Sequence, residues 1–289
     1  MRWWLGPVVL CALFVFGVTA TVCLLPQAAV QYTAESLYDE YMPSVVEIYA
    51  KRTLFSKDTY RGTGFFISED GMLVTAAHVL YFEDEGMVAT QVRVSIGDEE
   101  HFYKAKIVKV DLEHDVALLK VMQFSDLAES NGYTIDSSKA KKLNRRFKYM
   151  TMDYGYEPHA GDLVFTLGNP SKFRDVVSQG MVISNRIVDL EMKEDLLEFE
   201  DMVLTSLYLR PGNSGGPVFN GAGKVIGVAT VGSGSGPMSL YQKAKYIKAM
   251  LDDTSDEVII SQQRKLPADK AESEEKEEGE DSDKKALLS

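Results

Sequence analysis

Short segments rich in β-branched and aromatic residues, closely spaced along the chain, constrain its fold more than any other feature. Turn residues such as Glu69-Asp70-Gly71 and Gly168-Asn169-Pro170 separate these segments. Many short strands at close spacing predict an all-β barrel or sandwich, and they disfavour a parallel sheet alternating with helices. The predicted strands are 44–50, 62–68, 72–76, 91–96, 103–110, 115–121, 162–167, 176–184, 202–208, 217–220 and 224–231.

Two helices are expected at the ends of this β-rich region. Residues 33–42 suit a short helix with Thr33 as its N-cap. Residues 239–251 have helical periodicity, which places Leu240, Ala244, Ile247 and Leu251 on one face. The folded unit is therefore expected to span residues 33–251.

The N-terminal 30 residues carry an apolar run that is long enough to cross a membrane. Trp3 to Leu25 contains no charge and follows Arg2, and a spanning helix needs about 20 such residues. A single preceding Arg favours an inside N-terminus and an exported remainder. Residues 1–30 are predicted to be a transmembrane signal anchor. The alternative is a cleaved signal peptide, cut after Ala20 or Ala29. Both interpretations place the remainder of the chain on the extracytoplasmic side, in the periplasm or cell envelope.

Charge and cysteine content exclude several classes of function. The net charge is −12, so a nucleic-acid partner is disfavoured. The only cysteines, Cys11 and Cys23, lie in the apolar run, so the remainder has no disulfide, cysteine-ligated zinc or cysteine nucleophile.

Two polar segments stand apart from the predicted strands. Residues 252–289 hold 13 acidic and 6 basic residues, a composition that predicts an acidic, disordered tail. The basic segment 125–158 is interpreted as a solvated connection between two parts of the fold, with a docking patch for an acidic partner as the alternative.

A serine within a glycine-rich turn is the most specific chemical signal. Gly212-Asn213-Ser214-Gly215-Gly216 runs directly into the apolar strand 217–220. Glycines allow backbone N–H groups, here those of Gly212 and Ser214, to point toward a developing oxyanion. A serine hydroxyl is a weak nucleophile and needs a base.

His78 is the candidate base, and Asp115 is the candidate acid that orients it. His78 follows the apolar strand 72–76, and Asp115 opens the strand 115–121. His101 and His159 sit in polar surroundings, and His114 is expected to be exposed. The set Ser214, His78 and Asp115 requires no metal and no organic cofactor.

The order His78, Asp115, Ser214 resembles that of chymotrypsin-type serine proteases, and the chain looks most similar to the bacterial Deg/HtrA-type proteases. The resemblance covers residues 35–250. It rests on Gly62-Thr63-Gly64-Phe65, TAAHV, HDVALLK, Leu167-Gly168-Asn169-Pro170, Gln179-Gly180-Met181-Val182 and GNSGGPVFN.

The resemblance implies a fold and an assembly. The expected fold is two six-stranded antiparallel β-barrels, at about 44–124 and 160–235, with a C-terminal helix. It also suggests a homotrimer. Family members commonly carry a PDZ domain after the protease, but the 38 residues from 252 are too few and too polar for one.

The resemblance further implies a serine endopeptidase that cuts unfolded or extended protein substrates. It places Tyr208 at the base of the pocket for the residue before the cut, and Thr230, Val231 and Gly232 in its wall. None of these is a carboxylate, so a buried Lys or Arg of the substrate would have no partner. The bulky Tyr208 ring is expected to fill the pocket floor and exclude large aromatics. A small or medium aliphatic side chain is therefore expected there. The alternative function is a protease-like chaperone or binding module in which cleavage is secondary or absent.

Overall fold

A computed structural model describes residues 31–53, 56, 59–82, 86–97, 102–123, 145–170, 173–185, 201–232 and 238–253. The apolar run Trp3–Leu25, most of segment 125–158 and the tail from residue 254 lie outside these ranges. The predictions about them therefore stay predictions. Among the helices within these ranges, none has both the length and the apolar character that a membrane crossing requires.

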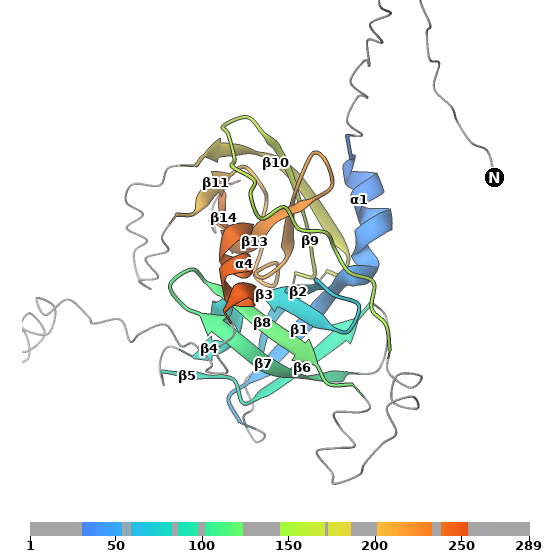
Figure 1. Ribbon diagram of the computed structural model, residues 1–289, viewed down its shortest axis with the longest axis vertical. Coiled ribbons are helices and arrows are strands. Elements are labelled where there is room, and N and C mark those ends of the chain that lie inside the picture. The colour runs from blue at the N-terminus through green and yellow to red at the C-terminus, as the bar shows by residue number, and fades with distance from the viewer. Residues whose placement is uncertain are drawn as a thin grey trace, which may run out of the picture. The chain divides into compact units, whose positions relative to one another are not determined.

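Six antiparallel strands close into a first barrel, in the order β1-β2-β3-β8-β7-β6 (Figure 1). Outward and inward side chains alternate along β1, where Val46, Ile48 and Ala50 are buried. The strands are β1 (Val45–Lys51), β2 (Tyr60–Phe66), β3 (Met72–Thr75), β6 (Gln91–Ile96), β7 (Tyr103–Asp111) and β8 (Val116–Val121). A separate hairpin, β4 (Tyr81–Phe82) with β5 (Met87–Val88), was not expected, because two-residue strands show no periodicity.

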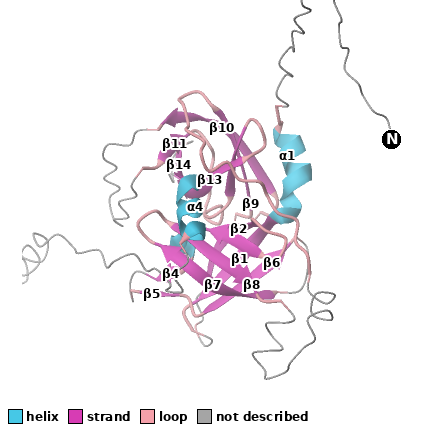
Figure 2. Cartoon of the chain, in the orientation of Figure 1, coloured by secondary structure: helices cyan, strands magenta, loops and turns pink. Residues whose placement is uncertain are grey.

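A second barrel of six antiparallel strands closes in the order β10-β11-β14-β13-β12-β9. Its strands are β9 (Leu163–Gly168), β10 (Val176–Ser184), β11 (Val203–Thr205), β12 (Pro217–Asn220), β13 (Val225–Gly232) and β14 (Ser239–Lys243). Figure 2 shows how strongly strands outweigh helices in the described chain. The prediction of an all-β fold of two six-stranded barrels with a C-terminal helix is confirmed.

The prediction of one helix over 239–251 is wrong in its first third. Residues 239–243 form β14, which pairs with both β11 and β13 and so completes the second barrel. All five of its residues are buried, so the strand shows no alternation that would distinguish it from a buried helix.

Helix α4 (Ala244–Asp252) therefore begins five residues later than predicted. It buries Ala244, Ile247 and Met250, whereas Leu251 is exposed. The predicted apolar face is therefore correct at Ala244 and Ile247, and Met250 takes the place predicted for Leu251.

Asp201 fixes the junction between β14 and α4. Its carboxylate accepts hydrogen bonds from Lys243 of β14 and from Tyr246 of α4, and it forms an ion pair with Lys245. Burial acts to raise the pKa of Asp201, but these contacts outweigh it and lower that pKa to about 2.

Helix α1 (Ala34–Tyr41) begins as predicted. The Thr33 hydroxyl accepts the Ser36 N–H at 3.1 Å, and a reciprocal bond completes a capping box. The Tyr41 ring at the end of α1 stacks on Phe219 of β12, with ring centroids 5.3 Å apart. The segment that precedes the first barrel is thus packed against the second.

Candidate active site

His78 lies in a short 3-10 turn, Ala77–Val79, directly after β3. Its neighbours Ala77 and Val79 are buried and fix the turn, while the His78 side chain is 30% exposed. The backbone N–H of His78 donates to Asp115 Oδ1 at 2.8 Å. The buried neighbours and the hydrogen bond to Asp115 together fix the backbone from which the imidazole projects.

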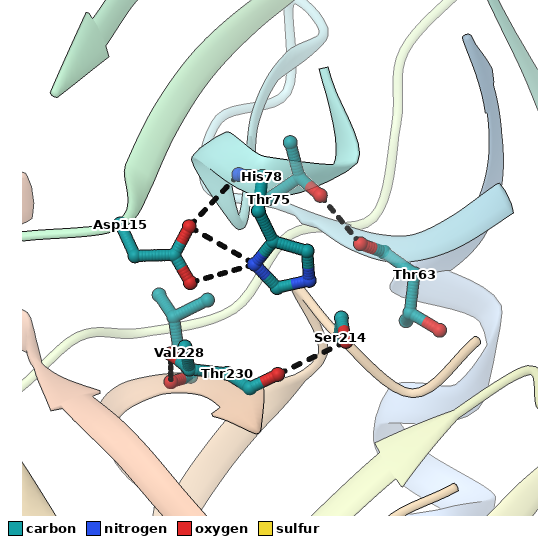
Figure 3. Close-up of polar contacts among 7 residues, drawn as sticks. All are labelled: Thr63, Thr75, His78, Asp115, Ser214, Val228 and Thr230. Atoms are coloured by element: carbon teal, nitrogen blue, oxygen red, sulfur yellow. Dashed lines mark hydrogen bonds and ion pairs between the residues drawn. The ribbon is translucent and has the colours of Figure 1, made fainter. Parts of the chain in front are cut away.

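Asp115 holds the ring of His78 as well as its backbone. Its carboxylate oxygens lie 3.0 and 2.8 Å from His78 Nδ1 (Figure 3). Asp115 is 1% exposed and has a φ of 53°, a left-handed conformation that Asp and Asn tolerate better than most residues. An ionised carboxylate only accepts hydrogen bonds, so it favours a proton on Nδ1 and leaves the Nε2 lone pair directed away.

Ser214 lies on the side of the imidazole away from Asp115 (Figure 3). Its hydroxyl donates to the carbonyl of Thr230 at 3.0 Å. The Ser214 side chain and the His78 ring thus face the same space from the two barrels (Figure 3). The structure thus brings together the three residues that the sequence predicted.

Thr63 of β2 anchors the serine loop of the second barrel to the first barrel. Its N–H donates to the Ser214 carbonyl at 2.8 Å, and its hydroxyl donates to the Gly212 carbonyl at 2.6 Å. The same hydroxyl accepts the N–H of Asn169 at 3.0 Å. Sequence reasoning assigned no role to Thr63, although Gly62-Thr63-Gly64 and Asn169 stood within the stretches that carried the resemblance.

Gly215 sits where no side chain fits. A Cβ atom there would lie 2.1 Å from the Thr63 carbonyl oxygen and 2.2 Å from Thr75 Oγ1, and the residue has a φ of 89°. We expect Gly215→Ala to lower the free energy of unfolding by about 3–5 kcal/mol, because overpacking and left-handed strain add. Denaturant unfolding measures this change.

Gly161→Ala is the matched control for that substitution. Gly161 has a φ of 95°, but a Cβ atom added there would meet no atom within 4 Å. Gly161→Ala introduces left-handed backbone strain but no steric clash, so it should lower the free energy of unfolding by only about 1–3 kcal/mol. Equal losses for the two variants would contradict the close approach of Gly215 to the first barrel.

The backbone amides of Gly212 and Ser214 were predicted to hold an oxyanion. Gly212 has a φ of 102°, which a glycine adopts readily. Within the described ranges, neither amide donates to a protein group. The neighbouring amides of Asn213 and Gly215 are occupied by the carbonyls of Arg210 and Ala229, at 2.9 and 2.7 Å.

Three of the predicted pocket residues lie on β13, and Tyr208 lies in the loop that follows β11. Thr230 is buried, and its carbonyl accepts the Ser214 hydroxyl. Val231 and Gly232 continue β13 and pair with Leu240 and Ser239 of β14. Tyr208 is 52% exposed, with the guanidinium carbon of Arg210 5.7 Å from its ring centroid.

Of the other three histidines, the structure describes His114 and His159. His159 is exposed, as expected, and His101 lies outside the described residues. The prediction that His114 is exposed is wrong: its side chain is 17% exposed and stacks on Tyr246, with centroids 3.7 Å apart. His114 Nδ1 also lies 2.8 Å from Asp111 Oδ2, a pairing that separation by three residues in a tight turn makes easy.

Two six-stranded barrels with a serine, a histidine and an aspartate gathered between them define the chymotrypsin-like class of protein. The profile of the family described as trypsin-like peptidase domain matches residues 62–228 of this chain. The chain belongs to this trypsin-like peptidase family.

Relatives agree with the predicted resemblance to Deg/HtrA-type proteases. A probable periplasmic serine endoprotease DegP-like of Chlamydia trachomatis is 34% identical over 181 residues, covering 62% of this chain and 30% of the relative. Serine protease HTR4 of Rattus norvegicus is 27% identical over 202 residues, covering 68% and 35%. The chain thus spans about a third of the length of these relatives.

A solved structure supports the fold. The crystal structure of the serine endoprotease from Yersinia pestis matches with a TM-score of 0.54 and 21% identity, covering 78% of this chain and 68% of that one. At this identity the likeness concerns the fold.

Proposed function

We propose that this protein is a serine endopeptidase in which Ser214 is the nucleophile, His78 the general base and Asp115 the residue that orients His78. The contact of both Asp115 oxygens with His78 Nδ1, on the side of the ring opposite Ser214, carries the proposal. Membership of the trypsin-like peptidase family and the serine endoproteases among its relatives support it.

The reaction follows from the positions of these groups. The Ser214 hydroxyl turns from the Thr230 carbonyl to His78 Nε2 and attacks the scissile carbonyl carbon while its proton passes to Nε2. The amides of Gly212 and Ser214 stabilise the resulting oxyanion. His78 then gives the proton to the leaving amine, and water hydrolyses the acyl-enzyme with His78 again as base.

The proposed substrates are unfolded or extended proteins cut after small or medium aliphatic residues. The pocket residues Tyr208, Thr230, Val231 and Gly232 offer no carboxylate, and the Arg210 guanidinium lies over the Tyr208 ring. A Lys or Arg side chain of the substrate would meet the like charge of Arg210 and no carboxylate, which disfavours basic residues before the cut.

Cut sites in a denatured test protein check both the activity and this specificity. We expect most cuts to follow Val, Ala, Ile or Leu, with a broad preference because one methylene group changes binding by only about 1–3 kcal/mol. Mass spectrometry of the products identifies the cuts. Predominant cleavage after Lys, Arg, Phe or Trp would refute the pocket assignment but not the catalytic one, whereas no cleavage at all would oppose the activity.

We further propose that the catalytic unit works outside the cytoplasm, held at a membrane by Trp3–Leu25. The uncharged run behind Arg2 and the periplasmic relatives support this location. We expect the full-length chain to stay in the membrane pellet after alkaline carbonate extraction. Recovery of the full-length chain in the soluble cytoplasmic fraction would contradict the proposal, and N-terminal sequencing would show cleavage after Ala20 or Ala29 if the run is removed.

A further inference from the structure

Five cationic side chains gather on the outer face of the first barrel, although the whole chain carries a net charge of −12. Strand register sets them side by side: Tyr49 of β1 lies between Arg61 of β2 and Arg93 of β6, and Arg93 faces Lys104 of β7. Neighbouring strands are about 4.8 Å apart, so this row crosses roughly 15 Å of the sheet. We call Lys51, Arg61, Arg93, Lys104 and Lys106 the cationic row.

Within the described residues no cation of the row forms a salt bridge, and the carboxylate nearest in sequence, Glu47, accepts the Tyr49 hydroxyl at 2.9 Å and pairs with Arg174. The salt bridges found there, such as Lys120 with Asp70 and Arg174 with Glu47, involve other cations. Arg93, Lys104 and Lys106 are exposed, and the Arg61 guanidinium carbon lies 5.2 Å from the centroid of the Tyr49 ring. Like charges at such spacing repel one another, so an anionic occupant would be attracted to this face.

The cationic row borders a hollow of about 160 Å³. Tyr49 and Phe102 meet edge to face at its wall, with centroids 5.1 Å apart, and Lys51, Arg61 and Arg93 line it. Cations around an aromatic wall suit a peptide whose carboxylates pair with the cations while its aliphatic stems lie on the rings. A compact inorganic anion would leave the rings uncovered.

The chain itself carries a segment with the complementary charge. Residues 272–283 (ESEEKEEGEDSD) contain eight carboxylates and one lysine. The described chain ends at Asp253, whose carboxylate pairs with Lys109 of β7 at 2.9 Å. Lys104 and Lys106 lie on that same strand. The chain therefore leaves the body beside a strand that contributes to the cationic row.

Chain length permits this contact with room to spare. Lys104 is five residues along β7 from Lys109, which is roughly 17 Å. Eighteen residues separate Asp253 from Glu272, and they can span up to about 60 Å when extended. A tethered segment also acts at a high effective concentration, on the order of millimolar, so individually weak ion pairs can hold it.

We propose that the acidic segment 272–283 binds the cationic row of the same molecule. Several exposed ion pairs act together, so the contact is sensitive to salt. The bound segment covers this face of the first barrel against other polyanions.

Carbodiimide cross-linking of the full-length chain, mapped by mass spectrometry, tests the proposal. It joins carboxylates to lysines that lie in contact, so we expect links from residues 272–283 to Lys51, Lys104 and Lys106 at low salt. Their yield should fall at least tenfold in 0.5 M NaCl. The double substitution Arg61→Glu with Arg93→Glu should reduce it at least tenfold as well, because it removes the attraction but keeps every target lysine.

A second pair of cations provides the matched control. Lys224→Glu with Arg146→Glu changes the net charge equally on exposed positions outside the cationic row and should leave the links unchanged. Equal loss in both double variants, or links spread evenly over all exposed lysines, would overturn the proposal.

A full-length variant with the eight carboxylates of 272–283 replaced by amides supplies an independent readout. The uncovered row should then bind added polyglutamate at least tenfold more tightly than the wild-type chain does. Equal binding by the two chains would mean that the tail does not occupy the row and that a separate acidic partner is its ligand. An unchanged melting temperature shows that each variant is folded. None of these readouts depends on peptidase activity, so they can fail while the proposed function stands.

Discussion

Ser214→Ala is expected to lower kcat for peptide hydrolysis by a factor on the order of 10⁶, as removal of a triad nucleophile does in serine proteases generally. The substitution removes one hydroxyl, whose hydrogen bond goes to the Thr230 carbonyl, so the fold should be preserved. Steady-state hydrolysis of a denatured protein or a peptide, with purified variants, measures the loss.

Two further variants show whether Ser214 acts together with His78. His78→Ala should lose about as much activity as Ser214→Ala, and the double variant should lose little more, because the two residues act as a unit. Ser68→Ala, in the turn between β2 and β3, should retain activity. Hydrolysis that persists in Ser214→Ala, with contaminating protease excluded, contradicts the assignment.

Asp115→Asn is expected to lower kcat about 10⁴-fold while leaving the protein folded. Asn tolerates the left-handed φ of 53° at this position, and its amide oxygen can still accept the His78 N–H. The Asn amide nitrogen, however, donates a hydrogen bond to His78 Nδ1, whereas the Asp115 carboxylate accepts one from it. The ring then keeps its proton on Nε2 and cannot take one from Ser214. Hydrolysis rates with matched melting temperatures check this result.

Asp111→Asn provides the control for that substitution. Asp111 Oδ2 lies 2.8 Å from His114 Nδ1, the same distance that joins Asp115 Oδ2 to His78 Nδ1. Because the Asp111–His114 pair lies outside the candidate site, its loss should leave kcat unchanged. If Asp111→Asn and Asp115→Asn lowered kcat alike, a role specific to Asp115 would be refuted.

Short-range patterns were sufficient to locate most of the strands, whereas their closure into two barrels was expected from the family resemblance. Alternation and turn residues located all six strands of the first barrel, because each strand has one buried and one solvated face or a clear turn beside it. They failed at Ser239–Lys243, where every residue is buried and periodicity carries no information. That strand is defined by its two partners in the closed barrel, and such pairing is set by residues far away in the sequence.

The candidate site was predicted less completely than the fold. Motifs singled out His78, Asp115 and Ser214, because such chemistry needs those residue types in a recognisable local context. The role of Thr63 depends on its contacts with Gly212, Ser214 and Asn169, more than 100 residues away. A threonine between two glycines gives no local sign of such contacts. The stacking of His114 on Tyr246 was hidden for the same reason.

Labelling with a fluorophosphonate probe tests the central claim most directly. The probe forms a covalent bond only with a serine whose hydroxyl is activated by a base, and peptide mapping identifies the residue. We expect the full-length chain, with and without added unfolded protein, to be labelled at Ser214, and labelling to disappear in Ser214→Ala and fall steeply in His78→Ala. A folded wild-type chain that takes up no label under either condition, or a label found on another serine, would contradict the account.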